Sequence, residues 1–256
     1  MLDVIVPVFN ESSNIKNLFD KLAENVKTPM CVNVIYDFDE DNTLPVIKRI
    51  MYCYKYEIRT IKNKYQKGAL NAIKTGFECC DNNAILVTMA DLSDSLDIVD
   101  EMYHLINDGF ELVCGSRYMK GGKQLGGPLL KGLFSRLAGI SLHILTRIPT
   151  HDVTNSFKMY SRKVIDKFQV ESTGGFELGM ELTVKAYSNG MRITELPSTW
   201  HDRTGGQSRF RLWRWLPRYL YWYFFAIWKT WTSIFNRKVY VSDFQTDEGE
   251  YIKVKK

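Results

Sequence analysis

Short apolar runs alternate with segments of helical periodicity over the first 115 residues of the chain. Polar or turn-forming residues bound each run, which is typical of buried strands. The pattern predicts five strands, at residues 4–9, 31–36, 58–61, 84–89 and 111–115. It predicts helices between them, at residues 44–54, 68–79 and 98–106, and a first helix that Ser12 or Ser13 begins as its N-cap. Because strands and helices alternate, we expect an α/β fold with a mostly parallel sheet and helices on both faces.

The second half of the chain contains the same kinds of element with longer connections. Two glycine pairs between residues 121 and 127 indicate a loop. Further helices are predicted at residues 129–145 and 176–189, and further strands at 158–160 and 193–196. We therefore expect one domain over residues 1–209, a basic aromatic helix over 210–238 and a tail over 239–256.

Charge and aromatic residues are concentrated near the C-terminus. Residues 201–238 contain eight Lys or Arg and one acid, a charge of +7, whereas the rest of the chain carries −2 of the total of +5. All six tryptophans lie between Trp200 and Trp231. The uncharged run over residues 219–228 is too short for a spanning helix, which needs about 20 apolar residues. The aromatic and basic side chains together favour a helix that lies in the interface of an anionic membrane. We expect Pro217 in the first turn of this helix.

Other positions for this aromatic helix are left open by its composition. It could pack on the body of its own chain, form contacts between copies in a homo-oligomer, or pair with other copies as a shallow membrane span.

The five cysteines are odd in number and form no CxxC, which predicts buried thiols in a reducing compartment. The residues after Met1 show no signal peptide. We therefore expect a peripheral protein on the cytoplasmic face of a membrane.

Polar clusters follow three of the predicted strands. They are Asn10-Glu11, residues 37–41, and residues 91–94. Since ligands bind beyond the carboxyl ends of parallel strands, we expect the clusters to converge there. Asp91 and Asp94 are close enough in sequence to share a divalent cation that holds a diphosphate. Alternatively, Asp94 or Ser95 caps the next helix.

Six strings in the chain together resemble a known family. They are VIVPVFNES, YDFDEDNT, KGALNAIKTGF, VTMADLSD, GSRY and DVTNSFKMY. In this order they are similar to inverting family-2 glycosyltransferases of GT-A fold, and most of all to the polyprenyl-phosphate sugar transferases, the dolichol-phosphate-mannose synthase group. The resemblance covers about residues 3–210. It implies a nucleotide-diphospho-sugar donor, a polyprenyl (dolichyl or undecaprenyl) phosphate acceptor and a divalent metal, Mg²⁺ or Mn²⁺.

The resemblance assigns residues to the donor. The positions that match the family's donor-binding residues are Pro7, Phe9, Asn10, Glu11, Asp37, Gly68, Asn71 and Asp91. Asp91 matches the retained acid of the DxD-type motif, and Met89 stands where the first Asp of that motif is usual. Asp94 is the expected second metal ligand beside Asp91.

The resemblance also assigns residues to the acceptor phosphate. These are Arg117, Lys131, Ser135 and Arg136. Arg203, in the loop beyond the last strand, is a further cation that we expect at the acceptor phosphate. Asp91, Arg117 and Glu181 are the implied catalytic residues, and Asp152 and Ser156 match the family's D-x-T-x-S stretch. The four histidines are scattered and are predicted to be structural or on the surface.

Several functions compete at this point. A lipid-phosphate acceptor is already ionised and needs cations rather than a general base. A sugar-hydroxyl acceptor, as in cell-surface polysaccharide synthesis, needs a carboxylate base, for which Glu181 or Asp152 would serve. A non-catalytic basic segment could bind nucleic acid or an anionic membrane, but no nucleic-acid module is recognisable, so no nucleic-acid partner is expected. The substitution at Met89 also leaves open a degenerate, inactive transferase.

Overall fold

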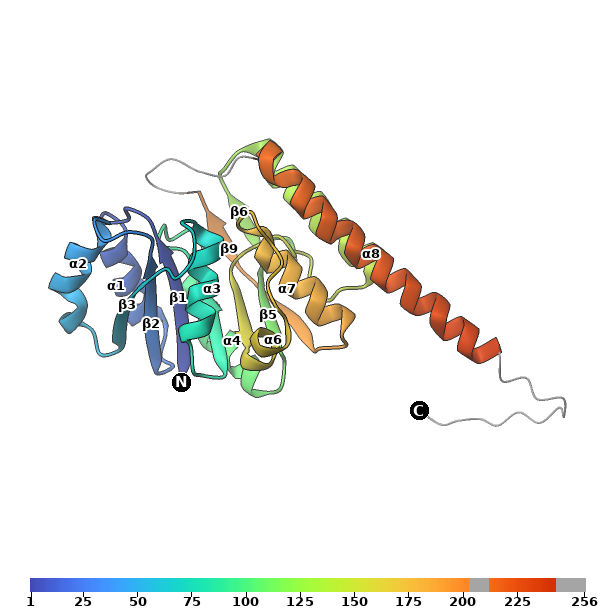
Figure 1. The fold of residues 1–256 in the computed structure, drawn as a ribbon, viewed down its shortest axis with the longest axis horizontal. Coiled ribbons are helices and arrows are strands. Elements are labelled where there is room, and N and C mark those ends of the chain that lie inside the picture. Colours follow the sequence, from blue (N-terminus) through green and yellow to red (C-terminus); the bar gives the residue numbers. More distant parts are fainter. Residues whose placement is uncertain (203–211, 243–256) are drawn as a thin grey trace.

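A central sheet of seven strands organises the molecule, in the order β3-β2-β1-β4-β7-β5-β8 (Figure 1). The computed structural model describes residues 1–202 and 212–242, with side chains of the second range over residues 215–232. The strands are β1 (Leu2–Val8), β2 (Met30–Tyr36), β3 (Glu57–Lys62), β4 (Ala84–Val87), β5 (Leu112–Ser116), β7 (Lys158–Ser161) and β8 (Ile193–Pro197). All neighbouring pairs are parallel except those of β7, which runs antiparallel to β4 and β5. The prediction of a mostly parallel sheet is confirmed.

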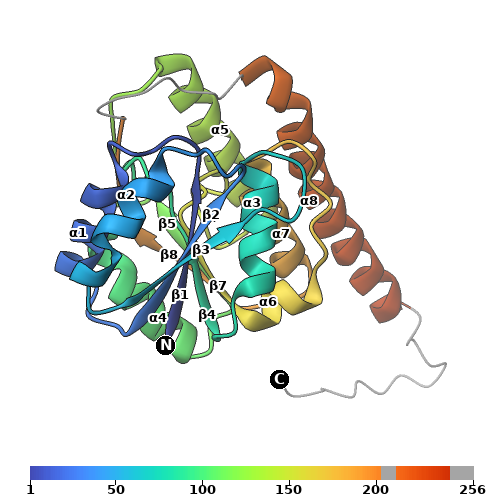
Figure 2. The same cartoon turned by 60° about the vertical axis from the view of Figure 1, so that its left-hand side comes forward.

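Helices cover both faces of this sheet (Figure 2). Val4 and Val6 of β1 lie in one hydrophobic core with α1 and α4, and Ile5 lies in a second core with α3 and α7. This division follows from the strand, whose successive side chains point to opposite faces. The helices are α1 (Ile15–Asn25), α2 (Thr43–Ile50), η1 (Met51–Cys53), α3 (Ala69–Cys79), η2 (Leu96–Ile98), α4 (Val99–Asn107), α6 (Arg162–Lys167) and α7 (Glu177–Ser188).

The start of α1 differs from the sequence prediction. The helix begins at Ile15 after Asn14, and no side chain caps it, so the assignment of Ser12 or Ser13 as N-cap is wrong. The carbonyl of Glu11 accepts the backbone N–H groups of Asn14 and Ile15, both at 3.0 Å. A backbone turn therefore satisfies donors that a serine side chain was expected to satisfy.

Two long helices pack against each other beside α7. They are α5 (Leu129–Thr146) and α8 (Leu212–Ser242), and α8 extends past the rest of the fold in both views (Figures 1 and 2). A third core joins Leu142 of α5, Val184 of α7 and Trp222 of α8. Before α5, a short strand β6 (Lys123–Leu125) pairs in parallel with β9 (Thr199–His201).

The position of Pro217 in α8 differs from the sequence prediction. Pro217 lies inside the helix rather than in its first turn, because the helix starts at Leu212. Among the described residues, α5 is the one helix long and apolar enough to cross a membrane by length and composition, and only 17% of it is buried.

Candidate functional site

The polar cluster that follows β1 is hydrogen-bonded to the cluster that follows β2. The backbone N–H of Asn10 donates to the carboxylate of Asp41 (3.0 Å), and that of Glu11 donates to the hydroxyl of Thr43 (2.8 Å). Asn10 has a φ of +57°, a left-handed conformation in which Asn is enriched. The ends of these two strands therefore form one polar surface, as the parallel topology predicted.

Asp37, Gly68 and Asn71 gather where β2 ends and α3 begins. The carboxylate of Asp37 accepts the backbone N–H of Gly68 (2.9 Å) and the side-chain amide of Asn63 (2.8 Å). The Asn71 amide donates to the carbonyl of Gln66 (2.7 Å). Gly68 has a φ of +131°, which strongly favours glycine. These bonds fix the loop before α3, whose role in donor binding stays a prediction.

Pro7 and Phe9 lie at the same edge of the sheet. Pro7 is in β1, in register with Ile35 of β2. The ring of Phe9 lies 5.2 Å from that of Phe38, and the Lys67 ammonium lies 5.0 Å from the Phe38 ring. Aromatic rings with a cation beside them form a surface on which a nucleotide base can stack.

Two buried carboxylates follow β4. Asp91 accepts the backbone N–H (3.1 Å) and the hydroxyl (2.5 Å) of Ser93. Asp94 accepts the side-chain amide of Asn155 at 3.4 Å. Burial raises the pKa of Asp94 to about 7, and the charge of Asp91 adds to this, whereas Arg117 opposes it. Of the alternative caps, Ser95 is the N-cap residue of η2, but neither η2 nor α4 has a capping hydrogen bond from a side chain.

The Asp91–Asp94 pair has the carboxylate chemistry that a divalent cation binds. A buried carboxyl whose charged form is disfavoured gains from a cation beside it, and Mg²⁺ usually takes one or two carboxylates plus substrate phosphates. Met89 packs against the core, so its thioether supplies no oxygen ligand. Over residues 1–202 and the described part of α8, no group of three or more His, Cys, Asp or Glu could hold a metal. A cation here would depend on two carboxylates and on oxygens of the substrate.

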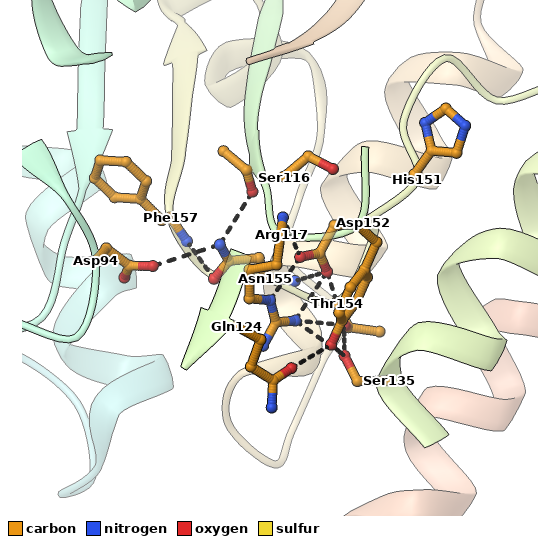
Figure 3. A network of polar contacts seen from close by, with 12 residues as sticks. Asp94, Ser116, Arg117, Gln124, Ser135, His151, Asp152, Thr154, Asn155 and Phe157 are labelled. Carbon is orange, nitrogen blue, oxygen red and sulfur yellow. Dashed lines mark hydrogen bonds and ion pairs between the residues drawn. The ribbon is translucent and has the colours of Figure 1, made fainter. Parts of the chain in front are cut away.

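Arg117, which follows β5, forms a two-point ion pair with Asp152 (Figure 3). Its Nε donates to Oδ2 of Asp152 (2.6 Å), its Nη2 to Oδ1 (2.9 Å) and its backbone N–H to Oδ2 (3.1 Å). Both side chains are almost fully buried. Burial alone would raise the pKa of Asp152, but the Arg117 guanidinium outweighs it and holds that pKa below its usual value. Burial likewise opposes the charge of Arg117, and Asp152 raises its pKa in turn.

Three hydroxyl groups surround this ion pair, and Figure 3 labels two of them, those of Ser135 and Thr154. Nη2 of Arg117 also donates to Ser135 of α5 (2.9 Å) and to Thr154 (3.2 Å). The Ser135 and Thr154 hydroxyls lie 2.6 Å apart, and the Tyr118 hydroxyl donates to Ser135 at 2.9 Å. The hydrogen bonds of the Arg117 side chain to Asp152, Ser135 and Thr154 use Nε and Nη2, and Nη1 is the guanidinium nitrogen that could donate to a further anion.

Sequence reasoning missed Asn155 and Lys158. The Asn155 amide donates to both Asp94 (3.4 Å) and the carbonyl of Gly115 (3.0 Å), so it links the acids after β4 to the end of β5 (Figure 3). Lys158 of β7 is fully buried, and its ammonium donates to the carbonyls of Asn155 (2.5 Å) and Asp152 (3.3 Å). A lysine at the start of a predicted apolar strand is the signal that could have found it, because a buried ammonium needs acceptors.

The remaining predicted residues lie apart from the ion pair or outside the description. Glu181 is buried in α7, where its carboxylate accepts the backbone N–H groups of Glu171 (2.7 Å) and Ser172 (2.8 Å) and pairs with Lys185 (2.6 Å). The structure therefore uses Glu181 to hold the segment before α7, which does not fit a catalytic role. Lys131 and Arg136 are on α5, the helix that carries Ser135, and Arg136 is exposed. Arg203 lies outside the described residues.

Comparison with known sequences links this chain to sugar transferases. The profile "Glycosyl transferase family 2" matches residues 3–168. A dolichol-phosphate mannosyltransferase from Pyrococcus furiosus is 26% identical over 216 residues, which are 82% of this chain and 59% of that protein. A polyprenol monophosphomannose synthase from Mycolicibacterium smegmatis is 24% identical over 211 residues, 80% of this chain and 79% of that protein. The chain thus spans less than two thirds of the length of the first relative.

Solved structures share the fold. Glucosyl-3-phosphoglycerate synthase from Mycobacterium tuberculosis, in complex with Mn²⁺, UDP-glucose and phosphoglyceric acid, superposes with a TM-score of 0.66 at 12% identity. The superposition covers 89% of this chain and 79% of that one. At this identity the similarity establishes the architecture alone.

Proposed function

Because this chain belongs to glycosyl transferase family 2, we propose that it moves a sugar from a nucleotide-diphospho-sugar to a polyprenyl phosphate, with inversion at the transferred carbon. The acceptor would be a dolichyl or undecaprenyl phosphate. One observation carries the choice of acceptor: the Arg117–Ser135 contact joins the end of β5 to α5, a helix with an exposed apolar surface. The exposed large apolar residues of α5 are Leu129, Leu130, Leu133, Phe134, Leu137, Ile144 and Leu145. A phosphate site on such a helix suits an anionic headgroup with a hydrocarbon tail.

The donor would bind along the ends of β1, β2 and β4. Asn10, Glu11 and Asp37 lie at the edge where the nucleotide is expected, and the Phe9–Phe38 pair offers a ring surface to the base. Asp91 and Asp94 would hold Mg²⁺ or Mn²⁺, which supplies charge stabilisation for the leaving diphosphate when it is bound. The family resemblance and the metal-bound fold neighbour support this assignment.

The acceptor phosphate would be held by Arg117. Asp152 orients the guanidinium through Nε and Nη2, so that Nη1 can donate to a phosphate oxygen without a search among rotamers. Arg136, on the same helix as Ser135, would add a second cation. The phosphate oxygen is already anionic near neutral pH, so attack on the sugar needs position and charge compensation rather than proton removal.

The same contacts argue against a sugar-hydroxyl acceptor. That reaction needs a carboxylate free to take a proton. Of the two carboxylates predicted for this role, Asp152 is neutralised by Arg117 and Glu181 is neutralised by Lys185 and two backbone N–H groups. Both carboxylates are therefore engaged by other partners, and a lipid-phosphate acceptor fits the geometry better.

We further propose that the enzyme works peripherally on the cytoplasmic face of an anionic membrane. On α8, Leu220, Phe224, Trp228 and Trp231 are exposed at helical spacing, whereas Trp222 and Ala226 are buried against the body. One stripe of α8 thus packs on its own chain, and the other stripe is free for lipid headgroups, where tryptophan is favoured. Contact between copies of the chain is the competing use of this stripe.

A donor screen tests the proposal. The protein would be incubated with polyprenyl phosphate and radiolabelled nucleotide-sugars, one at a time, with Mg²⁺ or Mn²⁺. We expect a labelled, organic-soluble product with one donor, and no product when the unphosphorylated polyprenol replaces the phosphate. Transfer to the polyprenol or to a soluble sugar would instead establish a hydroxyl acceptor.

A further inference from the structure

Glu195 makes a compact set of contacts behind the Arg117–Asp152 pair. It lies in β8, in register with Cys114 of β5, the strand that ends just before Arg117. One carboxylate oxygen accepts the backbone N–H of His151 (2.7 Å) and the hydroxyl of Thr150 (3.1 Å), and the other lies 2.5 Å from Nδ1 of His151. A side chain that is 10% exposed thus holds two consecutive residues at three points.

The Thr150 hydroxyl continues this set of contacts to Asp152. It donates to Glu195 and accepts the backbone N–H of Asp152 at 3.1 Å. Asp152 then accepts three hydrogen bonds from Arg117. Glu195 is therefore one hydroxyl away from the residue that orients the guanidinium.

The opposite side of this turn is covered by α5. A Cβ on Gly139 would come within 2.1 Å of the carbonyl oxygen of His151, so this close approach requires glycine. The His143 ring stacks on the His151 ring at 4.1 Å between centroids. The 150–152 turn is thus held between β8 and the helix that carries Ser135.

We propose that Glu195 is a positioning residue for the acceptor-phosphate site: through Thr150 and His151 it sets the turn that carries Asp152, and through Asp152 it sets Arg117. This inference rests on the proposed function, since the phosphate is the group that Arg117 would bind. Glu195 itself touches no substrate in this scheme. Its loss should affect acceptor binding and leave donor binding, at the ends of β1 and β2, nearly unchanged.

The kinetic test compares Glu195→Ala with Glu195→Gln. Gln keeps the shape, and its carbonyl oxygen can accept from Thr150 and the His151 backbone while its amide faces the His151 ring. We expect Glu195→Ala to raise the KM for polyprenyl phosphate about tenfold, with the nucleotide-sugar KM within about twofold of wild type. Glu195→Gln should restore most of the acceptor affinity. Glu57→Ala, which removes an exposed carboxylate from another strand, is the matched control and should change neither constant.

Two kinetic results would overturn the proposal. One is an unchanged acceptor KM in Glu195→Ala. The other is equal impairment of the Ala and Gln variants, because the negative charge and not the held geometry would then matter. If Glu195→Ala does not fold, Thr150→Val and Thr150→Ser answer the same question, since only the Ser variant keeps the hydroxyl between Glu195 and Asp152.

A nuclear magnetic resonance measurement separates this inference from the proposed function. The Nε–H signal of Arg117, assigned by its loss in Arg117→Lys, should be shifted and protected from exchange in wild type and in Glu195→Gln. It should lose both features in Glu195→Ala. If wild type transfers no sugar to polyprenyl phosphate, the proposed function fails, while an Arg117 signal that does not respond to Glu195→Ala refutes the positioning role by itself.

Discussion

The Arg117 guanidinium faces the Asp152 carboxylate in a two-point ion pair, with Nε–Oδ2 at 2.6 Å and Nη2–Oδ1 at 2.9 Å. The two side chains are 10% and 0% exposed, respectively. Because this bidentate ion pair is buried, it fixes the plane of the guanidinium and compensates the charges of both side chains. It therefore prepares Arg117 to contact one more anion at Nη1 without reorganisation.

The first prediction concerns the stability of this pair. Replacing Asp152 with Asn leaves the Arg117 charge buried without its carboxylate, so we expect the free energy of unfolding at pH 7 to fall by about 3–5 kcal/mol. Urea denaturation followed by circular dichroism measures this. The control, Asp166→Asn, breaks an exposed pair with Arg162 and should cost less than about 1 kcal/mol. Equal losses in the two variants would contradict the importance of the buried pair.

The second prediction concerns how the difference in unfolding free energy between wild type and Asp152→Asn depends on pH. The pKa of Asp152 is lower in the folded protein than the ordinary value of 3.8, so the folded state binds fewer protons there than the unfolded state. Its stabilising contribution is complete above the unfolded pKa and is lost as the pH falls through the folded pKa. The gap in unfolding free energy between wild type and Asp152→Asn should therefore narrow as the pH falls below about 4. If the difference in unfolding free energy instead widens as the pH falls, the predicted direction of the Asp152 contribution is wrong.

The core of the fold could be predicted from the sequence because its signals are local. The strand 31–36 is apolar apart from Asn33, and the structure has β2 over Met30–Tyr36. Parallel topology then predicts that residues after β1 and β2 meet, and Asn10 bonds to Asp41 across 31 residues of sequence. The N-cap of α1 and the position of Pro217 could not be fixed in this way, since backbone turns and tertiary packing decide where a helix begins.

The hydrogen-bond partners of the site residues, in contrast, could not be predicted from the sequence. A family match gives Arg117, Asp152 and Glu181 as positions, but not what each side chain touches. Arg117 meets Asp152 from 35 residues away, and Glu195 meets His151 from 44 residues away, both through strand register and a turn. Glu181 was assigned to catalysis on its position, and its contacts with backbone N–H groups and Lys185 could be seen only in three dimensions.

The third prediction concerns the metal. If Asp91 is the main protein ligand, Asp91→Ala should abolish sugar transfer, EDTA should do the same to wild type, and added Mn²⁺ or Mg²⁺ should restore only wild type. Asp94→Ala should reduce the rate strongly because no group of three His, Cys, Asp or Glu among the described residues could hold a metal, so the cation would depend on both carboxylates. The control is Asp97→Ala, an exposed acid in the adjoining η2 turn that should keep full activity. Full activity of wild type in EDTA would refute the metal assignment.

The fourth prediction concerns the acceptor phosphate. Arg136 is exposed on α5, one residue after Ser135, so Arg136→Ala should raise the KM for polyprenyl phosphate several-fold and leave the nucleotide-sugar KM unchanged. Arg49→Ala removes an exposed helical arginine from α2 and serves as the control. If Arg136→Ala has wild-type acceptor kinetics, the residue is an ordinary solvated charge and the cation for the phosphate is Arg117 alone or Lys131.

The last prediction concerns the membrane contact, which the exposed stripe of α8 allows to be tested without removing the helix. Phe224 and Trp228 are 62% and 57% exposed, whereas Trp222 faces the core, so the double variant Phe224→Ser, Trp228→Ser keeps the packed stripe. Wild type should float with anionic vesicles, and less so in high salt because Lys and Arg beside the stripe contribute about 1 kcal/mol each to attraction by anionic lipid. The double variant should bind vesicles far more weakly, since aromatic side chains at the headgroup boundary supply the apolar part of the attraction.

Tyr52→Ser, which removes an aromatic ring that is 86% exposed on η1, is the matched control and should float like wild type. Flotation of the double variant at the wild-type level would show that α8 is not the anchor, and a concentration-dependent change in its mass by light scattering relative to wild type would assign the stripe to contacts between copies instead.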